Sequence, residues 1–288
     1  MRNGRILFVL AISLVACGPK DRDNGNGGVD GNTGGGDGNT NQDNCSEEAK
    51  LVYTVDENNT LSTFDPTTKI FTDLGELNCP AQFGASPFSM GIDRNAGAWV
   101  LYSSSELFQV DTKTLACTKT SWSAPNGLVQ FGMGYSTDVA GGSTDTLFIA
   151  GGAGPTQPTS ALNKLDTSSM SPQMVGTVTG WPELTGTGNA ELWGFFPSAG
   201  TPRIEQIDKS NGSAARTFPL PTLSGEPTAW AFAFYGGDFW VFLAKDLDLS
   251  TTIYQVDGMN GTIKGMTSTG SRTIVGAGVS TCAPVVIF

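Results

Sequence analysis

Short apolar runs separated by Gly, Asp, Ser and Thr recur along the chain from residue 45 to residue 288. No window of helix length carries apolar residues at a 3.6-residue period. Residues 97–122, GAWVLYSSSELFQVDTKTLACTKTSW, read as three short strands joined by tight turns. Because other segments repeat this arrangement, the pattern predicts an all-β fold made of one repeated unit.

An aspartate at the end of a strand marks each repeat. The motif is an apolar residue, two free positions, an apolar residue, Asp, two free positions, and then Thr, Ser or Asn. Five segments carry it, with Asp65, Asp111, Asp166, Asp208 and Asp257. Their spacings of 46, 55, 42 and 49 residues are typical of β-propeller blades. Such a carboxylate can accept hydrogen bonds from backbone N–H groups two residues on, so we interpret these aspartates as turn residues and predict no metal site and no cofactor.

Two further strands precede each of these turns. Apolar runs rich in β-branched and aromatic residues, typical of a strand buried on both faces, occupy residues 51–55, 99–103, 147–151, 192–196 and 239–244. Strands rich in small residues come before four of them, at 88–93, 130–135, 183–188 and 230–235. Glycine lets backbones approach closely, as the innermost strands around a narrow axis must.

The first blade has no innermost strand of its own, whereas a spare one, TIVGAGVS, lies at residues 273–280. The two chain ends therefore complete one blade, and we predict a single five-bladed propeller over residues 45–288. A sixth, degenerate blade in the tail APVVIF, residues 283–288, is the alternative.

The chain opens with MRNGR and an apolar run at residues 6–15, the pattern of a secretory signal too short to span a bilayer. LVAC at 14–17 resembles the bacterial lipobox, in which the signal is cut before a Cys that is then lipidated. We therefore expect a signal peptide at 1–16 and a lipidated Cys17, with an ordinary signal peptide as the alternative. Residues 17–44 then form a disordered tether, since 18–44 contain nine Gly and six Asn and cannot bury enough surface to fold.

Cysteine usage predicts an oxidising compartment. Apart from Cys17, the chain has four cysteines, which allow three pairings. Cys45 precedes the first blade and Cys282 follows its returning strand, so this pair would join the ring where its ends meet. Cys79 leaves the outer strand of blade one and Cys117 lies on that of blade two, which favours the second pair.

Charge and residue types restrict the function. Removal of Arg2 and Arg5 with the signal takes the net charge from −11 to −13, and no Lys or Arg cluster occurs, which argues against nucleic acid as a partner. The chain has no His, which excludes Ser-His and Cys-His nucleophile pairs and most zinc sites. The remaining enzymatic option is a carboxylate pair near the axis, from Asp93, Glu183 and Glu226, although these acids sit at opposite strand ends. Asp93 is more simply part of a turn with Arg94.

A binding face is the other option. Connectors between blades, and those between second and third strands, open on the same side of a propeller. On that side we place a candidate ligand site made of Trp122, Trp181, Asp246, Asp248 and the loop 151–160. Exposed aromatic rings beside carboxylates suit a glycan or a peptide. The alternative is that both Trp side chains pack between blades.

The stretch GAWVLYSSSELFQVDTKT resembles the blades of bacterial extracytoplasmic β-propellers of the YVTN and NHL-like kind. With its lipobox, Gly/Asn tether and paired cysteines, the chain is also similar to lipid-anchored surface propellers of Gram-negative bacteria. This resemblance implies the fold over 45–288 and a lipid anchor in the cell envelope, in the outer membrane and facing the periplasm or the surface. It carries no catalytic residue across. We therefore expect a non-catalytic binding or scaffold module with a glycan, peptide or protein ligand, and a glycan-cleaving propeller as the alternative.

Replacement of the predicted lipidation site tests the anchor. Cys17→Ser should release the protein from membranes and abolish metabolic labelling with a fatty acid, because the substituted side chain has no thiol to acylate. Wild-type protein that is unlabelled and found outside the membrane fraction would contradict the lipobox interpretation.

Overall fold

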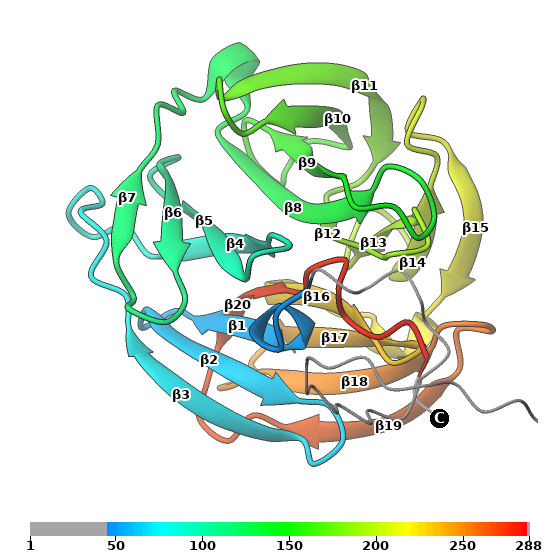
Figure 1. The fold of residues 1–288 in the computed structure, drawn as a ribbon. Coiled ribbons are helices and arrows are strands. Elements are labelled where there is room, and N and C mark those ends of the chain that lie inside the picture. The colour runs from blue at the N-terminus through cyan, green and yellow to red at the C-terminus, as the bar shows by residue number, and fades with distance from the viewer. Residues whose placement is uncertain (1–44, 287–288) are drawn as a thin grey trace, which may run out of the picture. The chain divides into compact units, whose positions relative to one another are not determined.

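The structure is a computed structural model that describes residues 45–286. Five four-stranded antiparallel sheets, the blades, stand around a common axis (Figure 1). The predicted all-β, five-bladed propeller is confirmed. The signal peptide, Cys17 and the tether lie outside the described residues.

Each blade runs from an innermost to an outermost strand. Blade 1 consists of β20 (Ile274–Gly278), β1 (Val52–Asp56), β2 (Thr60–Asp65) and β3 (Ile70–Glu76). Blade 2 consists of β4 (Pro87–Ile92), β5 (Gly97–Tyr102), β6 (Leu107–Asp111) and β7 (Cys117–Lys119). Blade 3 consists of β8 (Gln130–Thr137), β9 (Asp145–Gly152), β10 (Thr159–Asp166) and β11 (Ser171–Thr179).

The last two blades follow the same order. Blade 4 consists of β12 (Glu183–Gly186), β13 (Leu192–Phe196), β14 (Arg203–Ile207) and β15 (Ala214–Pro219). Blade 5 consists of β16 (Pro227–Tyr235), β17 (Asp238–Lys245), β18 (Thr252–Asp257) and β19 (Ile263–Ser268). Three short 3₁₀ helices occur among the described residues, at Glu48–Lys50, Pro125–Gly127 and Pro221–Leu223.

The two ends of the chain close the ring in blade 1. β20 pairs antiparallel with β1, in a register that sets Tyr53 opposite Gly278 and Val55 opposite Gly276. Residues 283–286 form no strand, and the described chain contains five sheets. The alternative of a sixth blade is therefore excluded for the part of the tail that the structure describes.

The repeated aspartates lie where their third strands end. In blade 2, Asp111 Oδ1 accepts hydrogen bonds from the backbone N–H groups of Lys113 and Thr114, both at 2.9 Å. Asp65, Asp166 and Asp257 make the same pair of bonds, and Asp208 Oδ1 accepts from the N–H of Ser210. The pKa of all five carboxyl groups is lowered, chiefly by a Thr or Ser hydroxyl at Asp65, Asp166 and Asp208 and by the backbone N–H groups at Asp111 and Asp257. Each side chain thus stabilises the turn into the outermost strand.

Small residues let the innermost strands approach one another around the axis. A Cβ added to Gly134 of β8 would lie 2.8 Å from backbone atoms of Leu184 on β12. A Cβ added to Gly276 of β20 would lie 3.1 Å from the backbone nitrogen of Met90 on β4. Such distances are shorter than normal contacts, so larger residues at these positions would push neighbouring blades apart.

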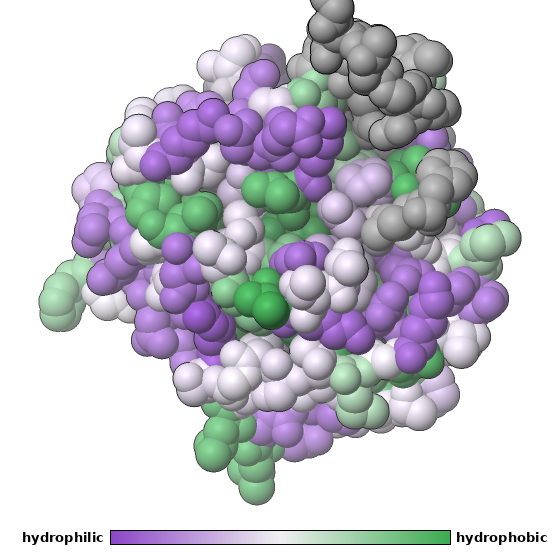
Figure 2. Space-filling model, turned by 60° about the horizontal axis from the view of Figure 1, so that its bottom comes forward, coloured by the Kyte–Doolittle hydropathy of each residue, from purple (hydrophilic) through white to green (hydrophobic). Residues whose placement is uncertain are grey.

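Five hydrophobic clusters, one between each pair of adjacent blades, form most of the core, and a small sixth cluster contains Ala49, Ala96 and Cys282. Blades 2 and 3, for example, bury Trp99 and Leu107 against Phe131 and Ile149. Blades 4 and 5 bury Trp193 and several phenylalanines in the same way. On the surface shown in Figure 2, by contrast, hydrophobic residues form small patches separated by hydrophilic ones. Stability therefore comes from blade-to-blade contact.

Two disulfide bonds hold the chain, Cys45–Cys282 and Cys79–Cys117, in the pairing expected from the sequence. Cys282 belongs to the segment after β20, residues 279–286, which crosses the ring at the end where the innermost strands finish (Figure 1). We call this end the terminal face. There Arg94 makes a salt bridge with Asp145 at 2.8 Å and also donates to Thr281 Oγ1 at 2.9 Å. Blades 2 and 3 are thereby joined to the C-terminal segment.

Removal of each disulfide tests how closure is stabilised. The Cys45–Cys282 bond spans 237 residues and the Cys79–Cys117 bond spans 38. Loop entropy predicts that Cys45→Ala with Cys282→Ala lowers the free energy of unfolding by about 5 kcal/mol, and the other double variant by about 4 kcal/mol. Urea denaturation of both double variants under non-reducing conditions measures which one loses more free energy of unfolding. A larger loss from the shorter loop would contradict this account.

Candidate functional site

Two adjoining cavities open at the end of the ring opposite the terminal face. We call this end the connector face, because it carries the links between blades and between second and third strands. The axial cavity, of about 170 Å³, is lined by residues that begin four innermost strands, including Phe88, Glu183, Trp230 and Val275. The outer cavity, of about 690 Å³, shares Phe88, Thr228 and Trp230 with it and extends over blades 3 and 4. One ligand can therefore occupy both.

Glu183 lies at the centre of this site. It begins β12 in blade 4, and its Oε2 accepts a hydrogen bond from Ser89 Oγ of blade 2 at 2.9 Å. Blades 2 and 4 are not neighbours, so this bond crosses the axis. The backbone N–H of Met133 in blade 3 also donates to the carboxyl group. Three blades thus hold one acidic group in the middle of the ring.

Burial determines the charge state of Glu183. The residue is 3% exposed, and loss of water contact raises its pKa well above the ordinary value, while the bonds from Ser89 and Met133 lower it. Burial is the larger effect. The carboxyl group therefore keeps its proton at pH values where an exposed glutamate has lost it.

Apolar and amide side chains form the walls of the outer cavity. Pro155, Gln157 and Pro158 come from the connector between β9 and β10, and Gln130 begins β8. Trp181 lines the cavity beside them although it is only 1% exposed. Its indole Nε1–H and that of Trp230 are buried and have no hydrogen-bond partner among the described residues. Two unused donors thus belong to side chains of this wall.

The predicted ligand-binding residues separate into three groups. Trp181 and part of the loop 151–160 do line the outer cavity. Asp246 and Asp248 are exposed, but they shape their own connector, accepting hydrogen bonds from the backbone N–H groups of Glu226 and Lys245. Trp122 is outside both cavities.

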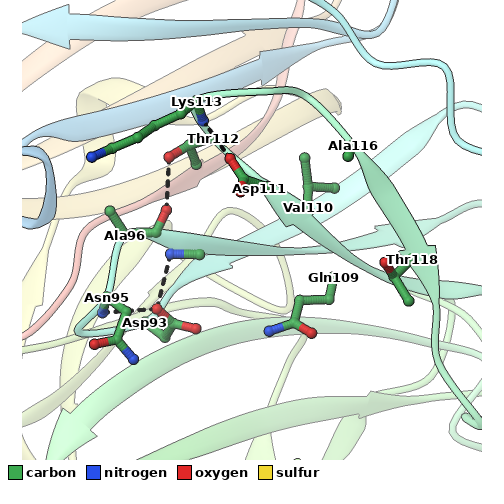
Figure 3. A pocket seen from close by; sticks show the side chains of 11 residues that line it. Asp93, Asn95, Ala96, Gln109, Val110, Asp111, Thr112, Lys113, Ala116 and Thr118 are labelled. Carbon is green, nitrogen blue, oxygen red and sulfur yellow. Dashed lines mark hydrogen bonds between the residues drawn. The ribbon is translucent and has the colours of Figure 1, made fainter.

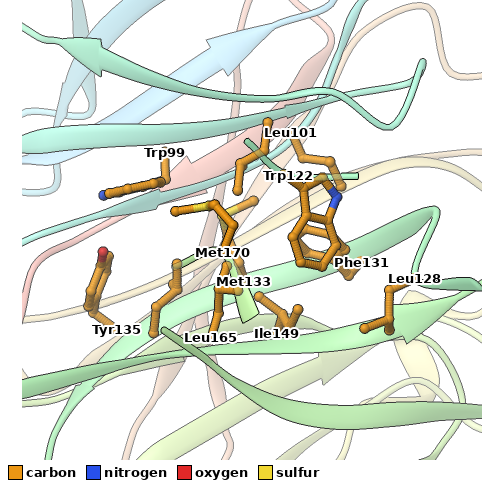
Figure 4. Packing of buried hydrophobic residues seen from close by; sticks show 12 residues of the cluster. Trp99, Leu101, Trp122, Leu128, Phe131, Met133, Tyr135, Ile149, Leu165 and Met170 are labelled. Atoms are coloured by element: carbon orange, nitrogen blue, oxygen red, sulfur yellow. The ribbon is translucent and has the colours of Figure 1, made fainter. Parts of the chain in front are cut away.

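Trp122 is a core residue, which corrects the expectation that its ring is exposed on the binding face. It is 6% exposed and lies edge-on to Phe131, with ring centroids 5.3 Å apart. Figure 4 shows it packed with Leu101, Met133 and Ile149 between blades 2 and 3. Trp181 is buried as well. Both indoles gain more by leaving water between blades than by remaining exposed on a connector.

A further cavity of about 630 Å³ lies beside blade 2 at the terminal face and contains Asp93 (Figure 3). Asp93 Oδ1 accepts hydrogen bonds from the backbone N–H groups of Asn95 and Gly97, both at 2.9 Å. Asp111 on the same wall closes its own turn. Because its carboxylates are occupied by turns, we do not assign this cavity a ligand. Asp93 is also at the opposite end of the ring from Glu183 and Glu226.

Residues 45–286 contain no group of three or more His, Cys, Asp or Glu side chains that could bind a metal ion. The cavity-lining side chains that the sequence analysis did not single out include Phe88, Gln130, Thr228 and Trp230. Three of these begin small-residue innermost strands, as Glu183 does. A large or polar residue at that position was the available signal.

Comparisons with known proteins assign the chain to no family. The chain matches no protein-family model and no curated protein. Among solved structures, TolB from Acinetobacter baumannii is 14% identical with a TM-score of 0.45, over 76% of this chain and 53% of TolB. A protein of unknown function from Bacteroides caccae is 14% identical with a TM-score of 0.42, over 76% and 73% of the two chains. The C-terminal WD40 domain of Sif2 is 12% identical with a TM-score of 0.37, over 78% and 70%.

Truncation of Trp122 tests its role in the core. Trp122→Ala should lower the free energy of unfolding by about 3–5 kcal/mol, because it leaves a cavity between blades 2 and 3. The matched control is Leu249→Ala, at a side chain that is 95% exposed, where we expect a change within about 0.5 kcal/mol. Urea denaturation measures both. Equal effects of the two substitutions would show that Trp122 does not stabilise the blade interface.

Proposed function

We propose that this protein is a cell-envelope lipoprotein that acts as a non-catalytic binding module through its connector face. The observation that carries the proposal is the pair of adjoining cavities at this face, the axial one lined by Glu183. A concave site with apolar walls and a few convergent polar groups is the usual form of a ligand site. The two disulfides indicate an extracytoplasmic protein, which supports the envelope location.

Exposed hydrophobic side chains support the same face. The three most exposed large hydrophobic residues of the described chain are Phe83, Leu249 and Leu247, at 104%, 95% and 94%. All three lie in connectors of this face, in the links β3 to β4 and β17 to β18. Side chains fully in water are available to a ligand larger than the cavities, such as a peptide or a protein.

Membrane attachment is proposed through Cys17 alone. Within residues 45–286, no helix is both long and apolar enough to cross a bilayer. A lipidated Cys17 would hold the propeller through residues 18–44.

A glycan-cleaving enzyme is the second candidate. Glu183 has the raised pKa of a general acid, and Glu226 lines the adjoining cavity. The binding role is preferred because Ser89 and Met133 already hold the Glu183 carboxyl group, and because the rest of the axial wall has no second acid.

A substitution in the shared wall tests the binding role. Thr228 is exposed and lines both cavities, so Thr228→Trp should obstruct them without disturbing the core. Thr217→Trp, at an exposed position of β15, is the matched control. Ligands of the full-length protein are first selected on peptide and glycan arrays. We expect Thr228→Trp to weaken their binding about tenfold or more, equivalent to about 1.4 kcal/mol, and Thr217→Trp to leave it unchanged.

Three results would decide against this proposal. Arrays without any ligand for the wild-type protein would remove its basis. Equal binding by Thr228→Trp and wild type would place the ligand elsewhere. Polysaccharide hydrolysis that is lost in Glu183→Gln would favour the enzyme.

A further inference from the structure

The carboxyl groups that line the two cavities have no positively charged partner in the same walls. Glu183 lines the axial cavity and Glu226 the outer one, and no Lys or Arg is among the described residues that line either. Glu226 is exposed, and the adjacent connector carries Asp246 and Asp248 beside one lysine, Lys245. Carboxylates on one side of a cavity attract cations and repel anions. A cationic ligand is therefore favoured by the whole site.

Glu183 lacks the counter-ion that a buried carboxylate needs. Its partners, the Ser89 hydroxyl and the Met133 amide, are both neutral. An isolated charge in such a place is unfavourable, and a buried carboxylate normally has a cation beside it. An ammonium group entering the axial cavity would supply that cation.

The size and walls of the axial cavity indicate what carries the ammonium group. Its volume of about 170 Å³ corresponds to roughly five or six water-sized groups, close to the four methylenes and one nitrogen of a lysine side chain. Phe88 and Trp230 lie along this space. Aromatic faces favour both alkyl chains and cations. Larger rings, such as a sugar, fit the outer cavity better.

The outer cavity has the features for the chain that bears the lysine. Gln130 and Gln157, which line it, have side-chain amide groups that can donate hydrogen bonds to a ligand. A peptide supplies carbonyl oxygens as acceptors, whereas a simple polyamine supplies none. Pro155, Pro158 and Pro227 add apolar walls. This combination favours a peptide over a free amine.

From these features we propose that the connector face recognises a lysine-containing peptide, with the lysine ammonium against Glu183 in the axial cavity and the peptide backbone in the outer cavity. This inference rests on the proposed binding function and adds the chemical class of the ligand. It also implies that binding releases a proton, because Glu183 must ionise beside the ammonium group. The other residues of the axial wall carry no charge, and Glu226 is the titratable group described in the outer wall.

The test titrates the full-length protein with the capped tripeptide acetyl-Ala-Lys-Ala-amide. Two further probes are its Nε-acetylated form, which has no charge, and spermidine, which has charge but no carbonyl group. Calorimetry in buffers with different ionisation enthalpies measures both affinity and proton release. We expect the lysine peptide to bind about tenfold or more tightly than either probe, with release of up to about one proton. Its affinity should rise with pH until Glu183 is ionised in the free protein.

Glu183→Gln keeps the shape of the side chain and removes its charge. It should weaken binding of the lysine peptide about tenfold or more and abolish the proton release. Glu47→Gln, at an exposed position outside both cavities, is the control and should leave affinity unchanged. Should Glu183→Gln fail to fold, the proton release and pH dependence of the wild-type protein still decide the matter.

Each alternative result has a separate meaning. Equal binding of the acetylated peptide, or binding without proton release, would overturn the lysine inference and leave the binding function in place. Equal binding of spermidine would overturn the peptide part. If the arrays select only neutral glycans whose binding Thr228→Trp weakens, the inference fails and the proposed function stands. Failure of the arrays to find any ligand concerns the proposed function itself.

Discussion

Each blade has two apolar faces, and the whole structure depends on burying both of them. A four-stranded sheet can cover only one face against one neighbour, so an open row of blades would leave two faces in water. Closing the ring buries them all, in five clusters between adjacent blades. The ring is held closed because the C-terminal strand β20 pairs with β1 and completes the first blade. The aspartate turns, by contrast, join the third strand to the fourth within each blade and lie away from the axis.

The same constraint creates the candidate site. Five innermost strands approach closely only because their residues are small, as Gly134 and Gly276 show. The residues at the start of these strands are larger, and the axial cavity lies there, lined by Phe88, Glu183 and Trp230. A carboxyl group placed there is shared by three blades and shielded from water, which explains its raised pKa. Packing of the fold and chemistry of the site therefore have one origin.

The fold could be predicted from the sequence because its determinants are local and repeated. The aspartate motif, the apolar second strands and the spare strand at residues 273–280 each have a fixed place in the repeat. The site was harder to predict, because Trp122 and Trp181 lie in connectors, where no periodicity tells whether a ring faces water or a neighbouring blade. Trp122 is buried because its ring packs against Phe131 of blade 3, a tertiary contact that the local sequence does not reveal. Glu183 was considered as a possible catalytic acid, but the orientation of its side chain depends on the hydrogen bond that Ser89 donates across the axis. No local sequence pattern indicates that bond.

The disulfide between Cys45 and Cys282 also fixes where mechanical force enters the molecule. A pull on the chain ahead of Cys45 is divided at that residue between the backbone that leads to β1 and the disulfide bond that leads to the C-terminal segment. From there the load spreads, because Thr281 bonds to Asp145 of blade 3 and Pro284 accepts from Gly236 of blade 5. Tension is thus shared by several blades, and no single strand is peeled from the edge of its sheet. The load therefore enters at the terminal face, at the end of the ring away from the two cavities.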